Sequence, residues 1–194
     1  MEKYISKKEK ASYGFAAVGS YMVAGITQSY LMYFFTDILI IPSAFVMVLM
    51  IVARVWDALN DPMMGVIVDR TSTKYGKMRP YVLIGSFLML VTTIVLFMPL
   101  TGAPTMFKMI FAAVSYIIFG MAYTLTDVPA MGLMSVATPN SDERASLLSF
   151  YVTVGSVGSL LPVGLLTIFR SFIPEKYVYF AMSIFVGIIT SAAY

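Results

Sequence analysis

The feature that most constrains this sequence is a group of polar residues inside a stretch long and apolar enough to cross a lipid bilayer. In VARVWDALNDPMMGVIVDR, positions 52–70, Asp57 and Asp61 follow Arg54 by three and seven residues, and Asn60 adjoins them. On a helix this spacing places all four side chains on one face. A charged side chain near the centre of a membrane costs roughly 2.5–3.5 kcal/mol, so it is retained where it pairs with or binds something. The pattern therefore predicts a membrane protein with an internal polar site, typical of a carrier of ions and polar solutes.

The composition supports a membrane protein and argues against an enzyme. Of the 194 residues, 59% are hydrophobic and 12% are charged, whereas a soluble domain carries about 25% charged residues. There is no cysteine and no histidine, which excludes disulfides and thiolate ligands and removes the commonest general base and metal ligand. No nucleophile–base pair or phosphate-binding loop is present either. We therefore predict no catalytic residues, no cofactor, and no metal beyond a monovalent coupling cation.

The distribution of apolar residues predicts an all-α polytopic membrane protein with six transmembrane helices, each of about the length that a ~30 Å hydrocarbon core requires. The sixth segment stops at the end of the sequence without a polar flank, so we expect the natural protein to continue beyond it. The short connections give no sign of a second domain within residues 1–194. The predicted segments are 12–35, 43–68, 80–100, 109–136, 145–169 and 177–194.

Basic residues predict the orientation of these segments, because cytoplasmic loops of membrane proteins carry an excess of Lys and Arg. One side of the predicted topology holds nine basic residues and the other holds three. The N-terminus is therefore expected in the cytoplasm, and six spans return the C-terminal end there, in a multi-pass protein of the cytoplasmic membrane. The nine are Lys3, Lys7, Lys8, Lys10, Arg70, Lys74, Lys77, Arg79 and Arg144, and the three are Lys108, Arg170 and Lys176.

The polar face of the second segment is a candidate cation site. Two carboxylates and an amide, from Asp57, Asp61 and Asn60, supply the oxygen ligands that small hard cations prefer. A proton is an alternative, because burial raises the pKa of a carboxyl group toward neutrality. With Arg54 counted, this face carries one net negative charge, which a bound monovalent cation would cancel. The competing interpretation is structural, with Arg54 neutralising one aspartate and the other bonding a neighbouring helix.

Polar residues in two other segments are candidates for contact with a substrate. Asp127 lies in YTLTDVP of the fourth segment, and Thr124 is one helical turn before it, so both side chains face the same way. Asp127 suits a cavity carboxylate that accepts hydrogen bonds from sugar hydroxyls, and a helix-to-helix hydrogen bond is the alternative. In the first segment, Tyr21 and Gln28 are seven residues apart and share one face, which makes them candidate cavity residues.

The connection GVIVDRTSTKYGKMRP, positions 65–80, is too short and too enclosed by apolar segments to bind nucleic acid. We interpret its basic residues as topology signals, with Asp69 and Arg70 as a candidate pair across a helix interface that opens and closes. The residues that mark this gating and topology loop are Gly65, Asp69, Arg70, Gly76, Lys77 and Arg79.

Three blocks together resemble a known family. RVWDALNDPMMGVIVDRTSTKYGKMRPYVLIG, with SYGFAAVGSYM before it and YTLTDVP after it, is similar to the glycoside–pentoside–hexuronide:cation symporters, the melibiose-permease-like branch of the major facilitator superfamily. The likeness runs over nearly the whole chain and covers only the N-terminal half of such a carrier. It implies the first six-helix bundle of a twelve-helix protein that works by alternating access.

By position, the resemblance implies a cation site of Asp57, Asn60, Asp61 and Thr124, with Asp127 as a sugar-binding carboxylate nearby. The sequence departs from the melibiose branch at three sugar-site positions, where Tyr21, Met131 and Val152 stand in place of Asp, Trp and Arg. We therefore expect a glycoside, pentoside or uronide other than melibiose as the substrate. The partners implied are this sugar, a Na⁺ or H⁺ ion, the lipid bilayer, and a C-terminal six-helix half or a second copy.

Two functions from different classes follow from these observations. The first is cation-coupled symport of a sugar or glycoside. The second is a non-transporting six-helix membrane sensor or assembly partner derived from a carrier half. The loss of sugar-site residues fits the second, whereas the joint retention of Asp57, Asn60 and Asp61 favours the first. Stabilisation of the protein by a cation separates the two.

Overall fold

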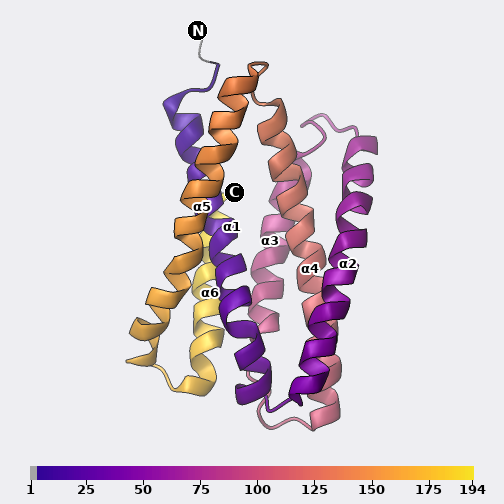
Figure 1. Ribbon diagram of the computed structural model, residues 1–194, viewed down its shortest axis with the longest axis vertical. Coiled ribbons are helices and arrows are strands. Elements are labelled where there is room, and N and C mark those ends of the chain that lie inside the picture. Colours follow the sequence, from indigo (N-terminus) through magenta and orange to yellow (C-terminus); the bar gives the residue numbers. More distant parts are fainter. Residues whose placement is uncertain (1–3) are drawn as a thin grey trace.

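The computed structural model describes residues 4–194, which form six long α-helices and one short π-helix, with no strand in that range. The all-α fold predicted from the sequence is confirmed. The helices run along the long axis of the molecule (Figure 1), and Lys3 lies outside the described residues. The elements are α1 (Lys7–Tyr33), η1 (Phe34–Ile38), α2 (Ser43–Arg70), α3 (Arg79–Leu96), α4 (Thr105–Val136), α5 (Ser141–Arg170) and α6 (Glu175–Ala193).

Short sequence signals set where the helices begin. At the upper end of Figure 1, the Ser6 hydroxyl accepts from the Glu9 N–H while the Ser6 N–H donates to the Glu9 carboxylate, a reciprocal cap of α1. Asn140 caps α5 by accepting from two backbone N–H groups. At the lower end, a proline precedes each of α2, α4 and α6, where its fixed φ suits the entry into a helix. These signals fix the turns between successive antiparallel helices.

Five of the helices are long and apolar enough to cross a membrane, and α1 is not among them. The residues of α1 that are buried in the bundle include many small or polar ones, such as Gly14, Gly19, Ser20, Gly25 and Thr27. These residues lower the hydropathy of α1, although it is as long as its neighbours and runs beside them. Each of the six predicted segments overlaps one α-helix, and the first also includes two residues of η1. The largest boundary difference is at the start of α1, which begins five residues earlier than predicted.

The packing of the helices follows an approximate internal symmetry. α1 packs against α5 and α6, α4 packs against α2 and α3, and α3 packs against α6. Exchanging α1–α3 with α4–α6 maps the α1–α5 contact onto α2–α4 and the α1–α6 contact onto α3–α4, and it leaves the α3–α6 contact unchanged. The match is incomplete, because α5 also contacts α6, whereas α2 and α3 make no comparable contact. This arrangement is what a 3+3 repeat would produce.

Glycine residues allow α1 and α5 to approach closely. A Cβ atom added to Gly158 of α5 would lie 2.9 Å from both the Cα and the carbonyl oxygen of Val18. Gly25 of α1 is in turn closed off by the backbone of Ser159. Lipid tails are as apolar as the helix surfaces, so the hydrophobic effect does not drive membrane helices together. Van der Waals packing at such close backbone contacts is a main source of their association. The GSVGS run of α5, positions 155–159, is therefore a packing surface.

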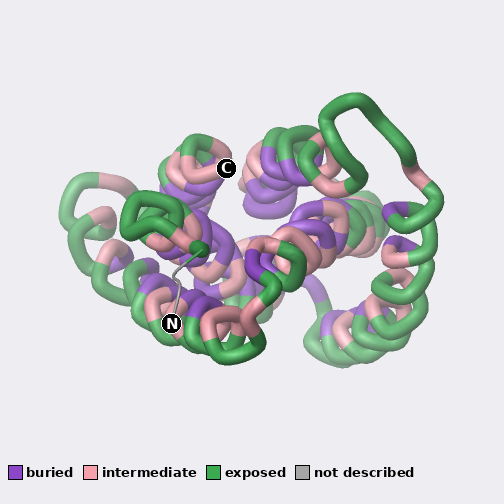
Figure 2. The backbone as a smooth tube through the Cα atoms, turned by 90° about the horizontal axis from the view of Figure 1, so that it is seen from above, coloured by how far each residue is buried: buried purple, intermediate pink, exposed green. Residues whose placement is uncertain are grey.

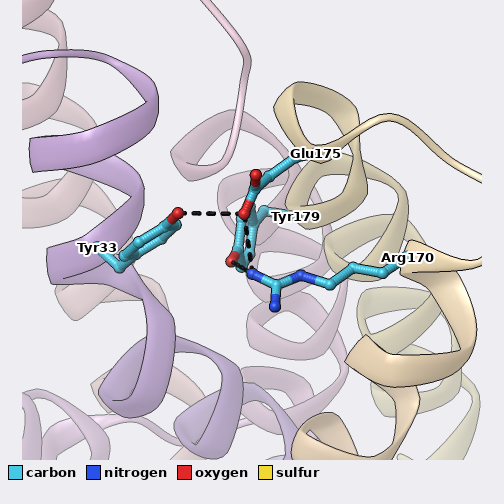
Figure 3. A network of polar contacts seen from close by, with 4 residues as sticks. All are labelled: Tyr33, Arg170, Glu175 and Tyr179. Carbon is cyan, nitrogen blue, oxygen red and sulfur yellow. Dashed lines mark hydrogen bonds and ion pairs between the residues drawn. The ribbon is translucent and has the colours of Figure 1, made fainter.

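Polar contacts hold the lower end of the bundle together. Arg170 of α5 donates to Glu175 at 2.9 Å and to the hydroxyl of Tyr179 at 3.0 Å, and Tyr33 of α1 donates to the same Glu175 (Figure 3). Nearby, the buried Lys108 of α4 donates to the carbonyl of Leu39 at 2.9 Å, just after η1. The end of α1 is thus tied to α4 on one side and to α6 on the other.

The outward faces of the helices are exposed and largely apolar. Viewed from above (Figure 2), buried residues face the interior and exposed residues face outward, most evidently on α2. Only 17% of the most apolar window of α2 is buried. Such a surface suits contact with lipid tails or with other membrane helices. The polar residues of α2 do not fit this purely apolar role.

Candidate functional site

A cleft of about 610 Å³ opens between α1, α2 and α4, close to the midpoints of α2 and α4. Its apolar wall comes mainly from leucine, isoleucine and methionine side chains of the three helices. Such a volume suits a small molecule, and predominantly apolar walls with a few polar groups are usual in ligand sites. The polar and aromatic residues that line it are Thr27, Gln28, Arg54, Trp56, Asp57, Asp61, Tyr116, Phe119, Tyr123 and Thr124.

The two aspartates of α2 face α4 at two successive levels. Thr124, which is buried, donates its hydroxyl hydrogen to Asp61 Oδ1 at 2.8 Å. One turn away, Asp57 lies against Gly120, where an added Cβ would be 3.0 Å from Asp57 Oδ1. The spacing of four residues is the same on both helices, so the pairs Asp57–Gly120 and Asp61–Thr124 lie in register. The absence of a side chain at Gly120 lets the Asp57 carboxylate reach the surface of α4.

Arg54 partly balances these two carboxylates. Its guanidinium lies 4.0 Å from Asp57 Oδ2, at the outer limit of an ion pair, and its side chain is 71% exposed. Asp57 and Asp61 also lie within electrostatic range of each other. The site therefore has one more negative than positive charge, and the long contact with Arg54 leaves Asp57 without a close ion pair.

Asn60 lies beside this pair without lining the cleft. Its side-chain nitrogen is buried, and so is the indole nitrogen of Trp56 one turn earlier. Neither nitrogen has a hydrogen-bond partner among residues 4–194. A buried donor without an acceptor costs about 1–3 kcal/mol, so the α2–α4 boundary contains polar groups that internal packing alone does not satisfy.

Asp127 lies one turn beyond Thr124 on α4 and within electrostatic range of Asp61. The structure gives it no hydrogen bond or ion pair with a described residue, and it does not line the cleft. Tyr21 lies between α1 and α5, edge-on to Tyr151 with ring centroids 6.0 Å apart, and its ring covers Gly155. The structure thus brings Gln28 into the cleft and places Tyr21 in a helix interface.

The connection between α2 and α3 lies at the upper end, away from the cleft. Gly76 has φ of 95°, a conformation that favours glycine, and Lys77 donates to the carbonyl oxygen of Asp69 at 3.1 Å. A Cβ atom added to Gly65 would meet no atom within 4 Å. Asp69 forms no ion pair with Arg70 or with any other described residue.

Sequence reasoning missed several residues of the cleft. Gly120 and Tyr116 on α4 were not singled out, and neither were Thr27 and Trp56. A usable signal existed for Gly120, because Gly120 and Thr124 repeat the spacing of Asp57 and Asp61. No group of three or more Asp, Glu, His or Cys residues that could hold a metal ion occurs within the described chain.

Comparison with known proteins identifies the family. The family profile described as MFS/sugar transport protein matches residues 12–194. The chain is 37% identical over 161 residues to the uncharacterized symporter YjmB of Bacillus subtilis (strain 168), covering 82% of this chain and 35% of that protein. It is 34% identical to the inner membrane symporter YicJ of Escherichia coli (strain K12), covering 81% and 34%. It is 30% identical to the isoprimeverose transporter of Lactiplantibacillus pentosus, covering 79% and 32%.

The chain belongs to the MFS/sugar transport protein family, and it spans about a third of the length of the curated relatives that it matches. The resemblance to glycoside–pentoside–hexuronide symporters is confirmed, and the match lies in the N-terminal part of such carriers. These relatives are named as symporters and transporters, not as enzymes, which agrees with the sequence analysis. The chain is thus part of a multi-pass membrane transporter fold.

Proposed function

We propose that this chain forms the cation-binding half of a symporter that couples the uptake of a sugar or glycoside to Na⁺ or H⁺ by alternating access. The observation that carries the proposal is the contact of Thr124 with Asp61 at 2.8 Å, inside a cleft that also holds Asp57. A carboxylate pair with a hydroxyl neighbour offers oxygen ligands to a small cation. The site's one net negative charge also favours the binding of a monovalent cation electrostatically.

We assign the cation to Asp57, Asn60, Asp61 and Thr124. A cation that reaches Asp61 would displace the hydroxyl hydrogen of Thr124 from the carboxylate and neutralise its charge, and the Thr124 oxygen would then turn toward the cation. Asn60 has a side chain next to this position and a buried nitrogen without a partner. Rotation of its amide would present the oxygen instead, so the side chain that is unsatisfied in this state becomes a ligand in the bound one.

The sugar is proposed to lie in the same cleft, with Gln28 as one contact. Asp127 would accept hydrogen bonds from the hydroxyls of a sugar that extends one helical turn beyond Thr124, past the present lining of the cleft. Binding of the cation would remove the negative charge of Asp57 and Asp61 and so favour a neutral, hydroxyl-rich ligand beside it. Tyr21 would join the site only if its ring left the α1–α5 interface. The name of one relative, an isoprimeverose transporter, supports a glycoside or pentoside as the substrate class.

We place the chain in the cytoplasmic membrane with its N-terminus in the cytoplasm. The support is the excess of basic residues at the end that holds the N-terminus, the α2–α3 connection and the α4–α5 connection. The side of α2 that lines the cleft would then border a second six-helix bundle, either a C-terminal half of the same protein or a second copy, and the cleft would lie between the two.

Substitution of Asp61 by asparagine in the complete carrier tests this function. We expect Asp61→Asn to abolish the stimulation of labelled-sugar uptake by the cation, because the amide keeps the shape but not the charge. Asp142→Asn, at an exposed position in the first turn of α5, is the matched control and should retain stimulation. Cation-stimulated uptake of normal size in the Asp61→Asn protein would overturn the proposal.

A further inference from the structure

The basic residues at the two ends of the bundle differ in how they are partnered. At the lower end, Arg170 pairs with Glu175, Lys108 donates to Leu39, and Lys176 lies over the ring of Tyr177. At the upper end, the connection from α2 to α3 carries four basic residues, Arg70, Lys74, Lys77 and Arg79, which we call the α2–α3 basic cluster. None of the four forms an ion pair within the described chain.

The contacts that the α2–α3 basic cluster does make leave its charge uncompensated. Lys77 donates to a backbone carbonyl, and Lys74 lies over the ring of Tyr75. The side chains of Arg70 and Arg79 make no hydrogen bond with residues 4–194, and both residues are exposed. The single acidic residue of this connection, Asp69, accepts from Lys77 through its main-chain oxygen only.

Two acidic residues elsewhere at the upper end, Glu9 and Glu143, accept hydrogen bonds from neutral donors. The Glu9 carboxylate accepts from the Ser6 N–H. Glu143 accepts from the N–H groups of Tyr4 and Ile5 and from the hydroxyl of Thr138. These interactions tie the N-terminal segment to the α4–α5 connection and involve no residue of the α2–α3 basic cluster.

The two arginines lie directly above apolar, outward-facing stripes. Leu83 and Phe87, which follow Arg79 at intervals of four residues, are about 60% exposed. Below Arg70, Val66 and Met63 are about half exposed. At 1.5 Å per residue, the Cα of Arg79 is about 6 Å along the axis from that of Leu83. The head-group layer of a bilayer is about 5–8 Å deep, so both guanidinium groups lie at its level when the stripes contact lipid tails.

We propose that the α2–α3 basic cluster is a docking surface for anionic phospholipid, with Arg70 and Arg79 holding the head-group phosphates while the acyl chains lie along α2 and α3. Charge complementarity selects this occupant, since the stripes below the arginines require an apolar partner and the arginines require an anion. An anionic phospholipid supplies both in one molecule. The inference is separate from the proposed transport function, because these residues lie outside the cleft.

Binding of phosphatidylglycerol to the purified chain tests the proposal. Native mass spectrometry would measure the binding constant at the tightest sites during titration with phosphatidylglycerol, and phosphatidylcholine would serve as the uncharged comparison. We expect the unmodified chain to prefer phosphatidylglycerol. Removal of each arginine should weaken this binding by roughly 5-fold, since a basic residue near an anionic surface contributes about a factor of this size.

Three variants make the result decisive. Arg70→Gln with Arg79→Gln should lose most of the preference, whereas Arg70→Lys with Arg79→Lys should retain it within about 2-fold, because the charge is kept. Arg170→Gln with Lys176→Gln removes two charges from the other end and should leave binding unchanged. The proposal is overturned if the unmodified chain shows no preference for phosphatidylglycerol, or if the two glutamine double variants lose it equally.

Discussion

Replacement of Gly158 by alanine probes the closest helix contact of the bundle. The new methyl group would lie 2.9 Å from two backbone atoms of Val18, whereas ordinary carbon contacts lie near 3.5–4.0 Å. Because backbone atoms cannot rotate away, α1 and α5 must separate by several tenths of an ångström. Overpacking of this kind costs about 1–3 kcal/mol. The better helix propensity of alanine returns about 1 kcal/mol, so the free energy of unfolding should fall by up to about 2 kcal/mol.

Gly164 on the same helix provides the matched control. A Cβ atom added there meets no atom within 4 Å, so Gly164→Ala has the propensity gain without the clash and should stabilise the protein by up to about 1 kcal/mol. Reversible unfolding in mixed micelles, followed by circular dichroism, gives both values. The two substitutions should therefore differ by about 1–3 kcal/mol. If Gly158→Ala stabilises the protein as much as Gly164→Ala does, the close α1–α5 contact is refuted.

Three further predictions concern hydrogen bonds to charged groups. Lys108→Met should lower the free energy of unfolding by about 1.5–3 kcal/mol, because the buried ammonium donates to the carbonyl oxygen of Leu39. Lys176→Met, at the exposed start of α6, should have little effect in the same assay, and equal effects of the two substitutions would contradict a stabilising role of the Lys108 hydrogen bond. Thr124→Val should raise the cation concentration that gives half-maximal stabilisation by about 5-fold, because the loss of one oxygen ligand weakens binding by about 1 kcal/mol. Thr124→Ser keeps the hydroxyl group and should leave this concentration unchanged. An unchanged value in Thr124→Val would show that Thr124 is not part of the cation site. The pKa of Glu9 lies below its ordinary 4.5, chiefly because the Ser6 N–H donates to the carboxylate. The ionised Glu9 therefore stabilises the fold above pH 4.5, and this contribution is lost as the pH falls through the lowered pKa. An NMR titration should show the lowered pKa in the unmodified chain and an ordinary one in Ser6→Pro, and a Glu9 pKa at or above 4.5 in the unmodified chain would refute the prediction.

Much of the fold could be predicted because membrane helices are defined by local sequence. Apolar length identified the segments, and Pro42, Pro104, Pro174 and Asn140 mark the starts of four helices. α1 shows where this signal weakens, since the small and polar residues that let it pack in the bundle also reduce its hydropathy. The π-helix at Phe34–Ile38 and the contact of Lys108 with Leu39 depend on how the lower ends of the helices pack together, which local sequence patterns do not predict.

The candidate site was only partly accessible from sequence. Helical spacing placed Asp57 and Asp61 on one face, but it could not show which helix they meet. The family resemblance suggested Thr124 as a partner of these aspartates. The role of Gly120 could be seen only in the structure, where the Asp57 carboxylate occupies the space that a side chain at position 120 would fill. Likewise, spacing grouped Tyr21 with Gln28, although packing against Gly155 turns the Tyr21 ring toward α5.

The measurement that tests the cation site most directly is the melting temperature of the purified chain in NaCl and in choline chloride at equal ionic strength, repeated over a range of pH and with LiCl. A cation that binds the folded state stabilises it by about 1.4 kcal/mol at ten times its dissociation constant. We predict a saturable increase in melting temperature with Na⁺, or with H⁺ if the proton is the coupling ion, and its loss in Asp61→Asn. Melting temperatures of the unmodified chain that are the same in every salt and show no dependence on Asp61 at any pH would contradict a cation site at Asp57 and Asp61.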